Sequence, residues 1–125
     1  MRLSRRLFNA AKPTLFEEIA ARRVPADIVF EDERVIAFRD TSPAAPVHVL
    51  IVPKQLGRLD RLSSATLEDK ELLGHLLLTV PRVAALLGVG DAFKVLINNG
   101  AGAGQSVFHL HLHLLAGAPT TPYKC

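Results

Sequence analysis

The stretch His109-Leu110-His111-Leu112-His113-Leu114-Leu115 places three histidines on alternate positions near the end of a 125-residue chain. This alternation predicts a β-strand with its imidazoles on one face and leucines on the other. Each buried imidazole nitrogen without a partner costs about 1 to 3 kcal/mol, so three on one face are hard to explain as core packing. Histidine, with an unperturbed pKa of about 6.5, can act as nucleophile, acid or base near neutrality. We therefore expect this face to carry out chemistry.

A glycine-punctuated loop over residues 98–108 runs directly into this strand. Glycines allow backbone amides to approach an anionic group closely, and Gln105 and Ser106 add side-chain donors at the strand entrance. The pattern therefore predicts a phosphate site. A dinucleotide-binding fingerprint or a P-loop requires a helix after the loop. Because a strand follows here, both of those sites are excluded.

Length and composition indicate a single globular domain, since 125 residues with 49% hydrophobic and 22% charged side chains suffice for one core. The lone cysteine, Cys125, excludes an intrachain disulfide and a cysteine-based zinc site, and favours a reducing compartment. No apolar run reaches the roughly 20 residues of a membrane span. Basic residues beyond the N-terminus are scattered and aromatic surface is scarce, so we expect neither a membrane nor a nucleic acid as partner.

Residues 1–12 form a basic tail, with no acidic residue before Glu17. As a helix, this tail would carry an apolar face flanked by arginines, which is typical of a mitochondrial presequence, whereas a solvated tail is the alternative. We therefore expect a cytoplasmic or mitochondrial location, with the single domain over residues 13–125.

The remaining patterns predict an α+β domain. Thr14-Leu15-Phe16-Glu17 is a capping box, so a short helix is expected over about residues 14–22 and ended by Pro25. A long helix is expected from residues 63–66 to 87, with Gly88 as its cap. The β-rich runs predict strands over residues 28–30, 35–38, 47–52, 93–97 and 107–115. Together they predict a five-stranded, mainly antiparallel sheet with the helices on one face and the histidines on the other.

The histidine stretch matches at every position the motif His-φ-His-φ-His-φ-φ, with φ hydrophobic, of the histidine-triad (HIT) superfamily. The chain resembles in particular its Hint branch, the histidine-triad nucleotide-binding proteins. The resemblance extends to Gly104-Gln105-Ser106-Val107, to Ala116-Gly117, and to the stretches from Phe30-Glu31-Asp32 to Pro53-Lys54, and covers about residues 14–117.

This resemblance implies a homodimer with one continuous sheet, which binds purine nucleotides (AMP or GMP derivatives) and hydrolyses adenosine 5′-phosphoramidates to AMP and an amine without cofactor or metal. By position, His111 would be the nucleophile, supported by His109 and His113, and His48 would complete the cluster. Asp40 would hold the ribose hydroxyls. The residues implied for the base are Phe16, Ile19 and Phe38, and those for the phosphate are Asn98, Gly104, Gln105 and Ser106.

The residues themselves permit this chemistry. A neutral His111 can attack phosphorus through one ring nitrogen if the other donates its proton to a hydrogen bond, which gives a nucleotidyl-histidine that water cleaves. Ser106, His113 and loop amides would stabilise the charge on the phosphate oxygens. The leaving amine needs a proton donor, which the sequence does not identify.

Three alternatives stay open at this point. Zinc could bind a His-x-His pair together with His48, although His109 and His113 lie about 13 Å apart along a strand, too far for all three to share one ion. The protein could be a diadenosine polyphosphate hydrolase, or a nucleotide-binding scaffold with incidental activity. Arg39 stands where the Hint branch usually has histidine, and the C-terminal tail lacks the tryptophan of some members, which bears on base and leaving-group preference.

Overall fold

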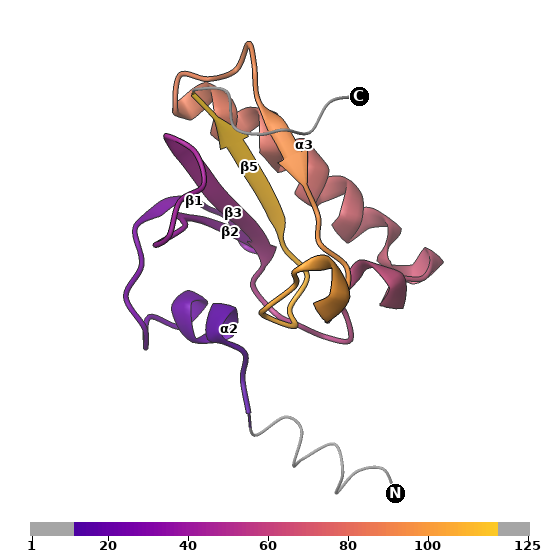
Figure 1. Ribbon diagram of the computed structural model, residues 1–125. Helices are drawn as coiled ribbons and strands as arrows, with labels where there is room; N and C mark the ends of the chain where they lie inside the picture. Colours follow the sequence, from indigo (N-terminus) through magenta and orange to yellow (C-terminus); the bar gives the residue numbers. More distant parts are fainter. Residues whose placement is uncertain (1–11, 118–125) are drawn as a thin grey trace, which may run out of the picture.

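The computed structural model describes residues 12–117, in which five antiparallel strands form one sheet in the order β1-β2-β3-β5-β4 (Figure 1). This arrangement confirms the predicted α+β architecture. The tail over residues 1–11 and the C-terminal residues 118–125 lie outside the described part, and with them the predicted presequence. The bounds are α2 Leu15–Ala20, β1 Ile28–Glu31, β2 Val35–Arg39, β3 Val47–Pro53, α3 Lys70–Leu86, β4 Lys94–Leu96 and β5 Leu112–Ala116.

The central pair of strands, β3 and β5, runs in register from Val47 opposite Ala116 to Ile51 opposite Leu112. The prediction that the last strand begins at residue 107 is therefore wrong. Before Leu112 the chain is held by the loop after β3 instead of by β3 itself, because the amide of Leu110 donates to the carbonyl of Leu59 at 2.8 Å. The first two histidines consequently lie just before β5, in a segment without regular secondary structure.

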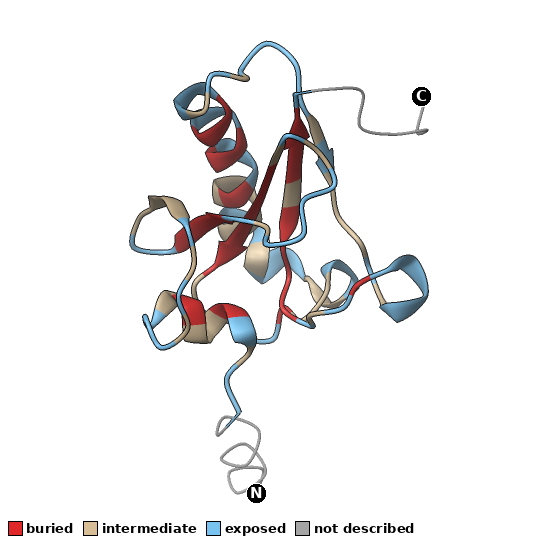
Figure 2. Ribbon diagram, turned by 60° about the vertical axis from the view of Figure 1, so that its left-hand side comes forward, coloured by how far each residue is buried: buried red, intermediate tan, exposed pale blue. Residues whose placement is uncertain are grey.

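The predicted alternation of faces is nevertheless confirmed. Leu110, Leu112 and Leu114 are buried in the core between the sheet and α3. Figure 2 shows buried positions on both the long helix and the strands of the sheet. The opposite face carries a second core, to which α2 contributes Phe16 and Ile19. The expectation that both helices cover one face is thus wrong, since the short helix packs on the histidine side of the sheet.

Helix α2 begins as the capping box predicts. The hydroxyl of Thr14 accepts from the amide of Glu17 at 3.0 Å, and the Glu17 carboxylate accepts from the amide of Thr14 at 3.1 Å. The helix ends at Ala20, earlier than predicted, because Arg22 adopts a left-handed backbone with φ of 66° before Pro25 is reached. This short helix therefore lies close to the chain that precedes β5.

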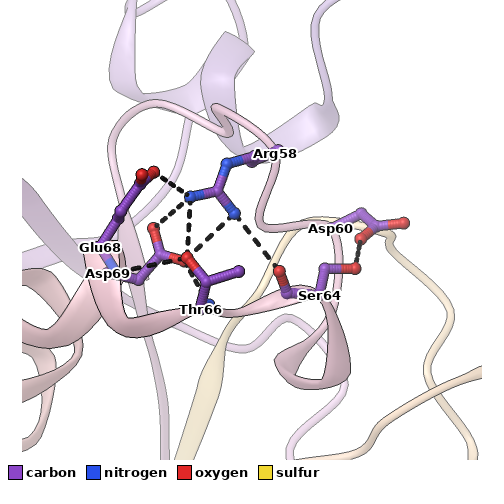
Figure 3. A network of polar contacts seen from close by, with 6 residues as sticks. All are labelled: Arg58, Asp60, Ser64, Thr66, Glu68 and Asp69. Atoms are coloured by element: carbon purple, nitrogen blue, oxygen red, sulfur yellow. Dashed lines mark hydrogen bonds and ion pairs between the residues drawn. The ribbon is translucent and has the colours of Figure 1, made fainter.

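The long helix begins at Lys70, later than predicted, because two short 3-10 turns precede it. Arg58 organises these turns, since its guanidinium reaches the side chains of Thr66, Glu68 and Asp69 (Figure 3). The helix ends at Leu86, one residue before the predicted end. None of the helices within residues 12–117 is long and apolar enough to span a membrane.

Candidate active site

A cavity of about 300 Å³ opens on the histidine face, between α2, the end of β2 and the segment that leads into β5. Its lining combines apolar side chains with carboxylate, hydroxyl and imidazole groups. A larger cavity, of about 410 Å³, lies beside the loop after β3, but none of the predicted site residues lines it. The residues that line the histidine-side cavity are Leu15, Phe16, Ile19, Val24, Pro25, Ala26, Phe38, Arg39, Asp40, Thr41, Leu50, Ser106, Val107, His111 and His113.

His109 is fully buried behind this cavity, and both of its ring nitrogens are hydrogen-bonded. Nε2 lies 2.7 Å from the carbonyl oxygen of Pro53, and Nδ1 lies 2.6 Å from the hydroxyl of Thr14. A carbonyl can only accept, so Nε2 carries the proton. Nδ1 of the neutral ring then accepts from the Thr14 hydroxyl, which fixes a single tautomer.

His111 lies in the cavity wall, and its ring is oriented by the preceding histidine. Its Nδ1 lies 2.7 Å from the carbonyl oxygen of His109, so Nδ1 carries the proton. The lone pair of the neutral ring is therefore on Nε2, which makes no hydrogen bond within residues 12–117. Phe16 packs edge-on against this ring at 5.0 Å. The imidazole is thus held in the orientation and protonation state of a nucleophile.

His48 and His113 form a second hydrogen-bonded chain. The amide of Ala44 donates to His48 Nδ1 at 3.0 Å, so the proton of neutral His48 is on Nε2. This proton is donated to His113 Nδ1 at 2.9 Å, which leaves the proton of His113 on its own Nε2. Within the described residues that Nε2–H has no partner although it is shielded from solvent. A buried donor without a partner in a cavity wall indicates a position for an acceptor on a ligand.

Burial keeps all four of these rings neutral. Desolvation lowers the pKa of His48, His109 and His111 below the ordinary value of 6.5. Desolvation, followed by the neighbouring His111 and His48, lowers the pKa of His113 to about 4. The tautomers assigned above therefore apply at neutral pH.

Comparison with known proteins agrees with this geometry, because a family model described as HIT domain matches residues 21–120. The chain belongs to the HIT family. An uncharacterized HIT-like protein of Synechocystis is 57% identical over 109 residues, which are 87% of this chain and 94% of that protein. Adenylylsulfatase HINT1 of Arabidopsis thaliana is 43% identical over 84% of this chain and 71% of its own length, so the chain has Hint-like relatives.

The fold of this HIT domain is also that of solved structures. The crystal structure of a HIT family hydrolase from Legionella pneumophila superposes with a TM-score of 0.81 at 38% sequence identity. The match covers 86% of this chain and 96% of that one. The five-stranded sheet with one long and one short helix is therefore the HIT fold.

The structure brings most of the residues implied by the HIT resemblance to one cavity. Those that line it are Phe16, Ile19, Phe38, Asp40, Ser106, His111 and His113. His48 and His109 lie directly behind its wall, where they hydrogen-bond to His113 and to the His111 segment. Asn98, Gly104 and Gln105 do not line it.

In this HIT domain, the Gln105 side chain stabilises the glycine loop and does not point to the cavity as a phosphate ligand would. The Gln105 side chain is buried; its oxygen accepts from the amide of Gly100 at 2.7 Å, and its nitrogen donates to the carbonyls of Asp60 and Val107 at 2.7 and 3.1 Å. Both ends of the amide are thus used to hold the loop. The side-chain donor expected from it at the phosphate is already satisfied within the protein.

Gly104 and Asn98 are adjacent in the same loop. Gly104 has φ of 95°, which side chains with a Cβ rarely adopt, and a Cβ built there would lie 3.9 Å from the Asn98 side chain. The turn that precedes Ser106 therefore depends on glycine. Ser106 is the loop residue whose side chain type and position at the cavity suit a phosphate oxygen.

Asp40 combines the two roles that the sequence leaves open. One carboxylate oxygen accepts from the amide of Ser42 at 2.8 Å, which is a local turn, and the other lies 3.5 Å from His48 Nε2. Ligand atoms of Asp40, His48 and His113 lie within 4.8 Å of one another, which is a spacing that a metal ion could use. However, His48 Nε2 carries a proton because Ala44 donates to Nδ1, so ligation through Nε2 would disrupt that hydrogen bond. These three residues therefore fit a chain of hydrogen-bonded side chains better than a metal site.

Sequence reasoning missed the groups that fix the tautomers. These are the Thr14 hydroxyl, the Pro53 carbonyl and the Ala44 amide. The capping box identified Thr14 only as the start of a helix, because its second partner is 95 residues away in the sequence. The apolar lining residues Val24, Leu50 and Val107, among others, have no pattern that separates them from ordinary core positions.

Proposed function

We propose that this HIT protein hydrolyses purine nucleoside 5′-phosphoramidates to the nucleoside monophosphate and an amine, through a nucleotidyl-histidine on His111. The observation that carries the proposal is the 2.7 Å hydrogen bond from His111 Nδ1 to the His109 carbonyl. It directs the lone pair to Nε2 in the cavity wall, which is the requirement for attack on phosphorus.

The cavity suits a nucleotide in both shape and polarity. Phe16, Ile19 and Phe38 offer flat apolar surface for a purine, as part of a wall that also includes Leu50 and Val107. The carboxylate of Asp40, which also lines the cavity, can accept from ribose hydroxyls through its remaining lone pairs. A nucleotide bound in this direction places its α-phosphate against the histidines and Ser106.

In the proposed first step, the His111 Nε2–P bond forms and the P–N bond breaks. The leaving nitrogen takes one proton, and the neutral pair of His48 and His113 does not hold a spare one. A bound phosphate anion beside His113 favours uptake of one proton by this ring, which then donates Nε2–H to the amine and returns to neutrality. Asp40, whose carboxylate lies 3.5 Å from His48 Nε2, can accept a hydrogen bond from the Nε2–H of His48 while His113 Nδ1 is protonated.

In the second step, water attacks phosphorus, the Nε2–P bond breaks and the nucleoside monophosphate leaves. The water loses one proton, for which the neutral His113 is the adjacent acceptor. His109 stays neutral throughout, because its two ring nitrogens are occupied by Thr14 and Pro53. No step requires a metal.

The test is steady-state hydrolysis of a fluorogenic adenosine 5′-phosphoramidate by the full-length protein, with and without EDTA, beside His111→Ala. We expect turnover that survives EDTA and is lost in His111→Ala. Diadenosine polyphosphate and adenosine 5′-phosphosulfate serve as comparison substrates, the latter because the Arabidopsis relative is named an adenylylsulfatase. Tight AMP binding without turnover would favour a binding protein, and loss with EDTA alone would favour zinc.

We also propose that the protein is a homodimer joined through β4 and α3. β4 is an edge strand, and α3 exposes Leu77, Leu78 and Leu86 at 55%, 70% and 65% of their surface. An open sheet edge and exposed apolar side chains on a helix are both typical of an interface. Sedimentation of the wild type and of Leu78→Glu tests this: we expect a dimer that the substitution converts to monomer, and a monomeric wild type would refute it.

A further inference from the structure

Thr14 connects the helix that lines the nucleotide cavity with the histidines that face it. Its hydroxyl oxygen accepts from the amide of Glu17 at 3.0 Å and so caps α2. The same hydroxyl lies 2.6 Å from His109 Nδ1. Because the hydroxyl oxygen accepts the hydrogen bond from the Glu17 amide, the hydroxyl hydrogen is available to donate to His109. One hydroxyl thus serves both as helix cap and as donor to a buried imidazole.

The other end of this connection is the nucleophile. His109 is held at its second nitrogen by the Pro53 carbonyl, and its own carbonyl accepts from His111 Nδ1 at 2.7 Å. The orientation of His111 therefore depends on how the His109 residue is held. Phe16, the second residue of the same helix, packs against the rings of His109 and His111 at centroid distances of 5.4 and 5.0 Å.

The capping box has a further anchor on the opposite side. The Glu17 carboxylate accepts from the amide of Thr14 at 3.1 Å and from the amide of Leu56, in the loop after β3, at 2.8 Å. The start of α2 is therefore fixed both to this loop and to His109. Movement of the helix, which carries the apolar wall of the cavity, would displace the Thr14 hydroxyl from the ring.

We propose that Thr14 is a positioning residue for the nucleophile: its hydroxyl keeps His109 as the neutral Nε2–H tautomer and couples the position of α2 to the orientation of His111. This inference rests on the proposed hydrolysis, in which His111 attacks phosphorus. Thr14 itself touches no reacting atom. Its effect should appear mainly in kcat, since Thr14 does not line the cavity and the lining residues Phe16 and Ile19 are unchanged in its variants.

The decisive variants separate capping from positioning. Thr14→Ser keeps both hydrogen bonds, and Thr14→Val loses both. Thr14→Asp keeps a strong helix cap but has no proton to donate, so His109 Nδ1 must bind a second proton to face it. Thr66→Val is the matched control, because Thr66 caps the turn before α3 in the same way and lies away from the histidines.

We expect Thr14→Val and Thr14→Asp to lower kcat about 10- to 100-fold, the scale of a small misplacement of a reacting group, with little change in AMP affinity. Thr14→Ser should restore most of the activity, and Thr66→Val should lose thermal stability without loss of kcat. Long-range proton–nitrogen NMR should show His109 as the Nε2–H tautomer in the wild type and doubly protonated at neutral pH in Thr14→Asp.

Wild-type kcat in Thr14→Val and Thr14→Asp, or an equal loss of kcat in Thr66→Val, would overturn the positioning role. An unchanged His109 spectrum in Thr14→Asp, in a protein that melts cooperatively, would also overturn it. The spectra are independent of turnover. If the wild type hydrolyses no phosphoramidate, the proposed function fails, while the His109 signals still decide whether Thr14 sets the tautomer.

Discussion

Replacing His113 with glutamine should make the stability of this protein less sensitive to acid. Burial lowers the pKa of folded His113 to about 4, from an ordinary value of 6.5. As the pH falls from 6.5, the unfolded chain therefore binds a proton at His113 while the folded protein does not. Because the unfolded state binds more protons in this window, the free energy of unfolding decreases as the pH falls.

The size of this effect follows from the two pKa values. Their difference of about 2.5, at about 1.36 kcal/mol per unit, corresponds to a loss of about 3 kcal/mol between pH 6.5 and 4. His48, His109 and His111 act in the same direction and steepen the wild-type dependence. Glutamine is chosen because its oxygen can accept from His48 Nε2 as the imidazole does.

The assay is urea unfolding of the wild type and His113→Gln at several pH values from 7 down to 4. The wild type should lose about 3 kcal/mol more than the variant over this range, most of it between pH 6 and 4. Ser106→Ala, which removes a polar cavity residue without a titrating group, should keep the wild-type dependence. Parallel curves for the wild type and His113→Gln would refute the assignment of His113 as a neutral, desolvated ring.

Three further perturbations test the rest of the site. His48→Leu should lower kcat about 100-fold, the scale of a lost acid–base group, while AMP affinity by calorimetry stays close to wild type, because His113 Nδ1 loses its hydrogen-bond donor. Gln105→Ala should reduce the unfolding free energy by about 1 to 3 kcal/mol in urea titrations, since it leaves buried loop amides and carbonyls unpaired. Gly117→Ala should lower it by about 2 kcal/mol or more, because the backbone has φ of 114° and a Cβ would lie 2.7 Å from that of Pro46; an unchanged melting temperature would contradict this packing.

The elements with a strong local signal were predictable from the sequence. The alternation in residues 109–115 gave the two faces correctly, because each leucine of the triad enters the core under α3. The Thr14–Glu17 spacing correctly predicted a capped helix. Boundaries were less well predicted where distant groups compete for the backbone, as where Leu110 bonds to Leu59 instead of to β3.

The chemistry of the site was predictable as residue types but not as protonation states. Nothing local to the triad indicates that Pro53, Thr14 and Ala44 fix which nitrogen of each ring carries the proton. These contacts join segments that are tens of residues apart or use backbone groups, which have no sequence signature. For Gln105 the sequence predicted a contact that the structure does not form. Its position beside a glycine loop suggested a bond to the ligand, whereas its side-chain amide is hydrogen-bonded to Gly100 and Asp60 within the protein.

The most direct test of the central claim is to detect the nucleotide on His111. Full-length protein is mixed with an adenosine 5′-phosphoramidate carrying a labelled phosphate, quenched with denaturant before one turnover is complete, and mapped by mass spectrometry of its peptides. We predict one AMP group on His111, formed at a rate that accounts for turnover and absent in His111→Ala. Turnover without a protein-bound phosphate at these times, or a label on another residue, would contradict the account.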